Sequence, residues 1–350
     1  MNIKITDIAT AKPDFQLSQK KLLGMIRRKR RLSRAEDVLY KRFLLDKGIE
    51  TRNFAVSRSR DLFIEDPDNL ITRFQKEAAR LSVSAIKKCL QRSAIHKKAI
   101  DCIIVTTCTG YLCPGLTSYI IEEAGLREDI FAVDIAGMGC GGALPAIWSA
   151  YNFLKAHKES TAIVVSTEIS SAAIFWDESP GIILSNSIFA DGSAVCIMTN
   201  KKGAAGFRIV DYLSKISPEH RDKLRFETKD SKLRNVISPD VPRIAGGMIK
   251  DIIKKLLKRN GLKQNDIMSW AVHPGGRKVL DSMQETMKLK DSDLNYSRDI
   301  LRRYGNMSSP SALFVLGSIF RSVKTKKGDL CILTSFGAGF SGYAALLSYE

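Results

Sequence analysis

The sequence has little of what marks a metal site, a disulfide framework or a membrane span. None of its seven cysteines forms a C-x-x-C pair, and most lie inside apolar runs, which favours reduced thiols over bridges or zinc ligands. Its four histidines have no second metal ligand at a binding spacing. No apolar run approaches the roughly 18 residues of a membrane span, and the N-terminus lacks a charged segment followed by an apolar one. We therefore expect an intracellular, cytoplasmic protein without a metal ion.

Negative charge is scarce relative to positive charge. The chain has 55 Lys and Arg against 37 Asp and Glu, a formal net charge of +18, and its densest cluster is the run RRKRR from Arg27 to Arg31. A solvated helix face would explain this run, and so would docking of an acidic carrier protein or of coenzyme phosphates. Nucleic acid is disfavoured, because no aromatic residues are interleaved with the cations and no binding motif occurs.

Short apolar runs alternate with amphipathic helical patterns along most of the chain. The patterns predict strands over 99–107, 160–168, 193–199, 266–273 and 329–336. They predict helices over 72–92, 143–156, 246–259, 276–287 and 310–323. Such alternation favours an α/β protein with buried sheets, and 350 residues suffice to bury a large core.

The predicted elements recur at a constant offset of 166 residues. The strand at 101–107 matches 267–273, the strand at 163–168 matches 329–334, and the helix end at 86–92 matches 252–258. We infer two similar halves, residues 1–200 and 201–350. The same offset relates Cys140 to Asn306 and Thr107 to His273. If the halves pack about a pseudo-two-fold axis, we expect Cys140, His273 and Asn306 to share one pocket.

Four glycines at 137, 139, 141 and 142 surround Cys140 in the stretch DIAGMGCGGALPAIW. A helix is predicted to begin directly after the cysteine, because Pro145 is tolerated only near a helix start. The thiol would then face the positive end of the helix dipole, and we expect a lowered pKa that favours the thiolate. The glycines are expected to let a bulky substrate approach the sulfur.

Cys140, His273 and Asn306 together permit two kinds of chemistry. In a hydrolase, the histidine would act as the base that activates the cysteine. In acyl transfer with carbon–carbon bond formation, the cysteine would hold an acyl thioester while histidine and asparagine donate hydrogen bonds to an enolate. A basic binding or scaffold protein on an inactive fold is a third possibility, disfavoured because all three candidate residues are present.

From about residue 45 to the C-terminus the chain resembles the thiolase-fold condensing enzymes, and most of all the type III polyketide synthases, or chalcone synthase family. Ketoacyl-acyl-carrier-protein synthase III enzymes are near relatives. The blocks that carry the resemblance follow in the family's order: GIETRNFA, VTTCTGYLCPGLTSYI, GMGCGG, VSTEIS, FADGSAV, WAVHPGG, YGNMSS and SFGAGFSG. HPGG and GNMSS are similar to the polyketide synthase versions, whereas a carrier-protein synthase usually has His-Gln-Ala-Asn after the strand.

The resemblance implies a homodimer with a layered αβαβα fold made of two equivalent halves. It implies that Cys140 is the nucleophile and that His273 and Asn306 support decarboxylation of a malonyl extender. The substrates would be acyl-CoA and malonyl-CoA thioesters, with no metal or redox cofactor. A single-round enzyme that receives its substrates from acyl carrier protein is the alternative.

The resemblance also implies further residues of the substrate site. Phe189 matches a gatekeeper phenylalanine, Ser170 and Ser308 match cavity-lining positions, and Cys113 matches the residue that enters the partner's cavity. Asn235 stands where the family has a second gatekeeper phenylalanine, which would change the choice of starter. Three basic residues fall near the place where the family contacts coenzyme A phosphates: Arg42, Lys47 and Arg52.

Overall fold

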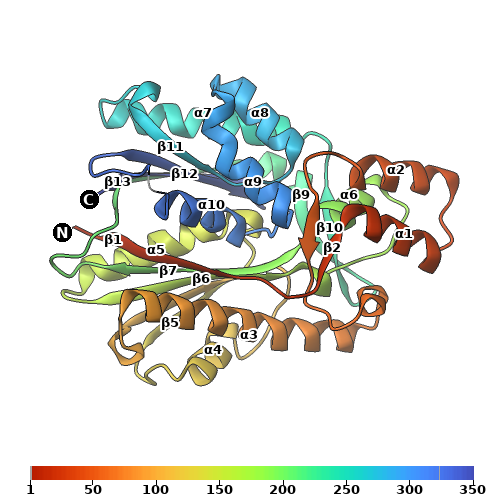
Figure 1. Cartoon of the computed structure of the whole chain (residues 1–350), viewed down its shortest axis with the longest axis horizontal. Helices are drawn as coiled ribbons and strands as arrows, with labels where there is room; N and C mark the ends of the chain where they lie inside the picture. The colour runs from red at the N-terminus through yellow and green to blue at the C-terminus, as the bar shows by residue number, and fades with distance from the viewer. Residues whose placement is uncertain (1, 323) are drawn as a thin grey trace.

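Two buried helices form the centre of the molecule, with strands on either side of them (Figure 1). They are α5 (Ala143–Ala156) and α10 (Pro310–Phe320). The sequence of α10, PSALFVLGSIF, is apolar on nearly every side, as expected for a helix that is covered all round. The computed structural model describes residues 2–322 and 324–350.

Further helices cover the outer faces of the strands, which gives five layers in the order helix, strand, helix, strand, helix (Figure 1). On one side lie α7 (Val241–Arg259) and α8 (Arg277–Met287), with α9 (Asn295–Tyr304) packed between α8 and α10. On the other side lie α3 (Pro67–Ser93) and α4 (Leu116–Ala124). The predicted α/β class with a layered arrangement is confirmed.

The strands form one nine-stranded sheet in the order β11-β12-β13-β8-β1-β7-β6-β4-β5. Their bounds are β1 (Lys4–Ala11), β4 (Cys102–Thr106), β5 (Phe131–Ile135), β6 (Thr161–Ile169), β7 (Asp191–Thr199), β8 (Phe207–Ile216), β11 (Ile267–Val272), β12 (Leu330–Gly337) and β13 (Ser341–Tyr349). The order β1-β7-β6-β4 is repeated as β8-β13-β12-β11, with the same pattern of parallel and antiparallel pairs. The repeat predicted from the constant offset therefore exists in the topology.

The two halves of the sheet are joined through two residue pairs between β1 and β8. The boundary placed near residue 200 falls in the connection between β7 and β8 and stays a prediction. The helix predicted over 143–156 coincides with α5, and the five predicted strands overlap β4, β6, β7, β11 and β12. The strands of the centre are long apolar runs because both of their faces are covered: every residue of β6 and β7 is buried.

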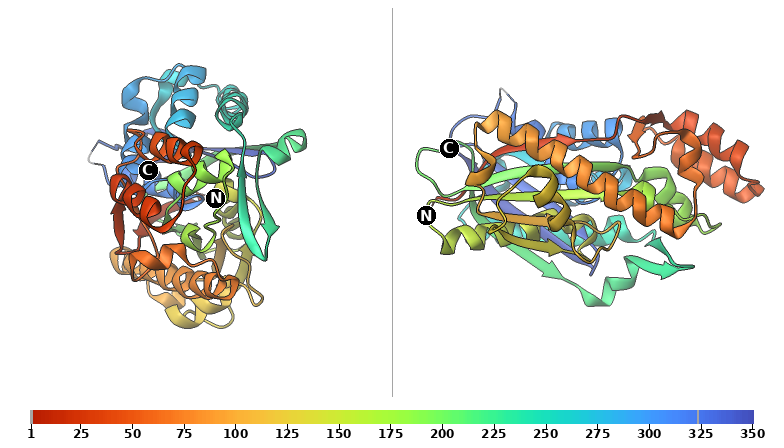
Figure 2. Two further views of the ribbon diagram at one scale, coloured as in Figure 1. Left: turned by 90° about the vertical axis from the view of Figure 1, so that its right-hand side faces the viewer. Right: turned by 90° about the horizontal axis from the view of Figure 1, so that it is seen from below.

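Smaller elements stand at one end of the molecule (Figures 1 and 2). They comprise helices α1 (Gln19–Lys29), α2 (Arg34–Leu44) and α6 (Pro180–Ile188), the strand pair β2 (Gln16–Ser18) and β3 (Thr51–Asn53), and the hairpin of β9 (Leu224–Lys229) and β10 (Lys232–Ile237). A capping box between Ser33 and Glu36 starts α2. Within the described chain, no helix is both long and apolar enough to cross a membrane.

Candidate active site

Cys140 lies in a short turn directly before α5 and is 7% exposed. Of its four neighbouring glycines, only Gly137 faces open space, with a φ of +80°. The others permit close packing. A Cβ atom on Gly139 would lie 2.9 Å from the Ala338 nitrogen, and one on Gly141 would lie 2.7 Å from the Tyr343 ring. The glycines were expected to make room for a substrate, but most of them instead seat the turn against the end of β12 and the start of β13.

Asn306 lies in the connection between α9 and α10, and its side chain is fixed at both ends. The Nδ2 atom donates to the Gly275 carbonyl at 2.9 Å, and Oδ1 accepts from the Ser308 backbone N–H at 2.8 Å. These two partners settle which end of the amide is the nitrogen. The second N–H of Nδ2 is directed to the Cys140 thiol in the resting site, and it can donate to a substrate in its place.

His273 follows β11 directly and is 1% exposed. Its ring stands edge-on to Phe336, with 5.4 Å between the ring centroids. Neither ring nitrogen has a hydrogen-bond partner among the residues that the structure describes. Burial lowers the pKa of His273 to about 3, so the imidazole is neutral near pH 7. Phe336 is followed by Gly337, which packs against the turn that carries Cys140, so β12 connects the two sites.

Burial raises the pKa of the Cys140 thiol to about 12, and hydrogen bonds with Ser308 and Asn306 offset this only in part. The expectation of a lowered pKa is therefore wrong for the resting site. A thiolate at this depth loses its hydration, and that loss exceeds the stabilisation by the start of α5. The resting site therefore holds a neutral thiol at Cys140 and a neutral imidazole at His273.

We expect alkylation of Cys140 by iodoacetamide to accelerate about tenfold per pH unit from pH 7 to pH 10. Only the thiolate reacts, and a thiol with a pKa of about 12 is almost entirely protonated over this range. Timed mass spectrometry of the Cys140 peptide measures the rate, and the exposed Cys113 peptide in the same digest reports on the reagent. A rate that levels off below pH 8 would contradict a raised pKa.

A buried carboxylate, Glu168 at the end of β6, connects the loops on both sides of the site. It accepts hydrogen bonds from the backbone N–H groups of Cys108 and Thr109 at 3.0 and 3.1 Å. It also accepts from the hydroxyls of Ser309 at 2.7 Å and Ser308 at 3.3 Å. Burial raises the pKa of Glu168, and these donors counteract the rise. The signal in the sequence is a single charged residue inside the otherwise uncharged run IVVSTEIS, which had no predicted role.

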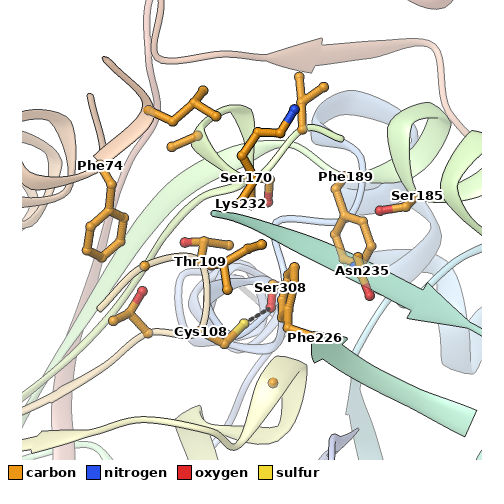
Figure 3. Close-up of a pocket in the computed structure, with 18 of the residues that line it drawn as sticks. Phe74, Cys108, Thr109, Ser170, Ser185, Phe189, Phe226, Lys232, Asn235 and Ser308 are labelled. Carbon is orange, nitrogen blue, oxygen red and sulfur yellow. Dashed lines mark hydrogen bonds between the residues drawn. The ribbon is translucent and has the colours of Figure 1, made fainter. Parts of the chain in front are cut away.

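A cavity of about 500 Å³ opens at Cys140 and is lined mainly by apolar side chains (Figure 3). Six predicted site residues line it: Cys140, Phe189, Ser170, Ser308, Asn235 and Arg52. Further lining residues come from α3, from the loop at 107–111 and from the β9–β10 hairpin. His273 and Asn306 are not among the lining residues but are almost completely buried.

The three basic residues expected near coenzyme phosphates lie in different surroundings. Arg42 and Lys47 are exposed on and after α2. Arg52 is 1% exposed and donates to the Gln19 side chain at 2.8 Å and to the Phe189 carbonyl. Burial lowers its pKa to about 9. Its bonds to Gln19 and Phe189 support the backbone at Phe189. Arg52 also lines the cavity, and its Nη2 atom has no hydrogen-bond partner within the described structure, so its contact with coenzyme phosphates stays a prediction.

Asn235 has a direct cross-strand partner, Phe226 on β9, and both line the cavity. Side chains of a directly opposed pair point to the same side of a hairpin. The hairpin therefore presents an aromatic ring to the cavity, although Asn235 itself is polar. Phe226 could not be predicted from the sequence, because only the strand register shows which residue stands opposite Asn235.

The backbone of Phe189 pairs with that of Asn306 in an isolated parallel bridge. The Asn306 N–H donates to the Ile188 carbonyl and the Ala190 N–H donates to the Asn306 carbonyl, both at 2.9 Å. Phe189 and Asn306 are thus held in a fixed relation. Cys113, by contrast, is exposed and is not among the residues that line the cavity.

Two family models match this chain. The model described as FAE1/Type III polyketide synthase-like protein matches residues 7–260, and that of the chalcone and stilbene synthase C-terminal domain matches residues 209–348. A 3,5-dihydroxyphenylacetyl-CoA synthase of Amycolatopsis orientalis is 28% identical over 352 residues, covering 99% of this chain and 93% of the relative. A 1,3,6,8-tetrahydroxynaphthalene synthase of Streptomyces peucetius subsp. caesius is 25% identical over 349 residues, with the same coverage.

The fold is similar to that of solved members of this family. The 1,3,6,8-tetrahydroxynaphthalene synthase of Streptomyces coelicolor A3(2) superposes with a TM-score of 0.93 at 24% identity, over 99% of both chains. The polyketide synthase PKS-I of the brown alga Ectocarpus siliculosus gives a TM-score of 0.90 at 23% identity, over 100% of this chain and 98% of that chain. The predicted thiolase-like fold is confirmed. The family models cover most of the chain and favour the polyketide synthases over the carrier-protein synthases, so the chain belongs to the type III polyketide synthase family.

Proposed function

We propose that the protein joins an acyl starter to malonyl units by decarboxylative condensation of thioesters. The observation that carries the proposal is the opening of an apolar cavity of about 500 Å³ at Cys140, beside a fixed amide and a neutral imidazole. Hydrolysis would require only that water reach the thioester, whereas a cavity lined mainly by apolar side chains suits an acyl chain. The thioester substrates supply the chemistry, and no separate cofactor is required.

The first step loads the starter. The sulfur of Cys140 attacks the carbonyl carbon of the acyl thioester, a new carbon–sulfur bond forms, and the coenzyme leaves as its thiol. His273 has two unpartnered ring nitrogens and can carry the proton from Cys140 to the leaving sulfur.

The second step extends the chain. The malonyl carboxylate leaves as carbon dioxide, and its bonding electrons pass to the thioester carbonyl as an enolate. The second Nδ2 N–H of Asn306 and the ring N–H of neutral His273 donate to this oxygen. The enolate carbon attacks the acyl group on Cys140, the new carbon–carbon bond forms, and the Cys140 sulfur is released.

We further propose a homodimer in the cytoplasm. Strand β5 is an edge strand of the large sheet, and its Phe131 is 51% exposed. On the loop that carries Cys113, Tyr111 is 76% exposed. An uncovered sheet edge with apolar side chains favours pairing with a second copy, and that loop would then close the partner's cavity. All seven cysteines carry free thiols, which supports a reducing compartment.

The test is mass spectrometry of products after incubation with malonyl-CoA and a panel of acyl-CoA starters. We expect products that differ from the starter by whole units of malonyl minus carbon dioxide, and an acyl adduct on the Cys140 peptide. Hydrolysis of the starters without any extended product would instead support the hydrolase.

The Phe226→Ala protein should accept starters longer than those of the wild type. Phe226 lines the cavity, and its removal leaves space for additional methylene groups, each of which changes kcat/KM by about tenfold or more. Competition between starters that differ by two carbons measures the shift. The matched truncation Phe320→Ala, at the end of α10 and outside the cavity, should leave the preference unchanged. An unaltered preference in Phe226→Ala would show that another residue limits the chain.

A further inference from the structure

The net positive charge of the protein is concentrated in one small element. Residues 20–47, here called the basic hairpin, cover α1 from its second residue, the turn that follows it, α2 and the three residues after α2. They hold eleven Lys or Arg against three Asp or Glu, a net charge of +8 out of +18 for the whole chain. The basic hairpin stands at one end of the molecule (Figures 1 and 2), where solvent surrounds its outer side.

The few acidic groups near the basic hairpin are already engaged. Asp37 pairs with Arg27 at 2.6 Å, and Glu65 pairs with Arg30 at 2.9 Å. Glu36 accepts from the Ser33 backbone in the capping box. Nine cations remain exposed and have no ion pair among the described residues: Lys20, Lys21, Arg28, Lys29, Arg31, Arg34, Lys41, Arg42 and Lys47.

One face of α2 combines these charges with exposed apolar side chains. Val38 is 59% exposed and Leu45 is 47% exposed. They lie seven residues apart and therefore on the same side of the helix, with Arg34 and Lys41 in the same row. A dense set of cations beside exposed aliphatic side chains suits a protein partner of opposite charge.

The end of this face adjoins the loop that carries His273. Directly after α2, Asp46 pairs with Arg277 at 2.6 Å, and Gly48 packs against the Arg277 side chain. Arg277 begins α8, immediately after the 274–276 loop. In that loop, the Gly275 carbonyl accepts from Asn306. A partner bound to α2 would thus lie next to the loop between the surface and the catalytic amide.

We propose that the basic hairpin binds an acidic carrier protein, which delivers a thioester on its flexible prosthetic arm. The proposal rests on the condensation proposed above. Transfer would form the bond between the acyl carbon and the Cys140 sulfur, break the bond to the carrier's sulfur, and move the Cys140 proton to that sulfur. One coenzyme molecule is too small to neutralise cations spread over two helices, and a second copy of the hairpin would repel the first.

The test compares an acyl carrier protein and coenzyme A as donors of the same acyl chain. The variant Arg34→Glu/Lys41→Glu should lower kcat/KM for the carrier-bound chain at least about tenfold and change the coenzyme A value by less than about twofold. The control Lys254→Glu/Lys255→Glu makes the same charge change on exposed positions of α7 and should affect neither donor. Unchanged coenzyme A turnover also shows that the variant is folded.

Two results would overturn the docking surface: equal loss with both donors, or no loss with the carrier. Loss of binding to phosphatidylglycerol vesicles or to duplex DNA, with carrier turnover unchanged, would assign the hairpin to lipid or nucleic acid and equally overturn it. Failure of the wild type to acylate Cys140 from either donor would instead contradict the proposed condensation. In that case fluorescence anisotropy of labelled carrier decides the docking question: binding lost only in Arg34→Glu/Lys41→Glu supports the surface, and absence of binding overturns it.

Discussion

Replacement of Cys140 with alanine should abolish condensation while leaving decarboxylation of malonyl-CoA measurable. Cys140 is the proposed attachment point of the acyl chain, so we expect a loss of at least about a thousandfold in product formation. Decarboxylation needs only donors to the enolate oxygen, and Asn306 keeps its bond to Gly275 without the thiol. Product formation and release of carbon dioxide, followed in the same reaction, separate the two steps.

The matched control is Cys108→Ala, because Cys108 is a second thiol that lines the same cavity. The Cys108 sulfur forms hydrogen bonds with Glu168 and Ser308. Its removal should therefore reduce the rate of condensation without removing the acyl adduct from the Cys140 peptide. If the Cys140→Ala protein still becomes acylated and still forms extended products, another residue is the nucleophile, and Cys108 is the first candidate.

The His273→Ala protein should lose about a hundredfold to a thousandfold in malonyl-CoA decarboxylation, because one preorganised donor to the enolate is removed. His273 makes no hydrogen bond through its ring within the described structure, so the truncation leaves no protein group unpaired. His273→Gln supplies a neutral N–H donor and should restore part of the rate. Equal rates for the alanine and glutamine proteins would argue that the imidazole acts in another way.

The pH profile of decarboxylation tests the same assignment. With a pKa of about 3, His273 is protonated only in strong acid and stays neutral between pH 5 and pH 9. We therefore expect no step in the decarboxylation rate from this imidazole across that range. A step near pH 6.5, the ordinary value for histidine, that disappears in His273→Gln would show that the ring is solvated during turnover.

Much of the fold could be predicted from the sequence. Buried strands such as β6 and helix starts such as that of α5 are local patterns, and their order recurs at one offset. That offset singled out His273 and Asn306 together with Cys140, and their catalytic roles stay predictions. Strands with a weaker local pattern were missed. Strand β5 is half exposed and β8 has polar residues along most of its length, so neither shows the continuous apolar run of a buried strand.

Properties that depend on depth or on distant neighbours could not be predicted from the sequence. The start of α5 suggested a thiolate at Cys140, but the raised pKa follows from burial under residues of both halves. The enclosure of Arg52 depends on contacts with Gln19 and Phe189, which are remote in the chain. Glu168 likewise accepts hydrogen bonds from segments about 60 and 140 residues away in the sequence. The motif that contains Glu168 gives no information about these donors.

The bridge between Phe189 and Asn306 has a consequence for how such an enzyme can evolve. The proposed gate, Phe189, and the proposed enolate donor, Asn306, are held together by the same pair of backbone hydrogen bonds. Arg52 stabilises the gate by donating a hydrogen bond to the Phe189 carbonyl. A mutation that widens the gate by moving this backbone would also displace the Asn306 amide. A change of substrate size at this wall of the cavity would therefore lower the turnover rate. The β9–β10 hairpin has no such tie to the catalytic amide in the described structure, and it is the wall where new chain lengths can be explored while the chemistry stays intact.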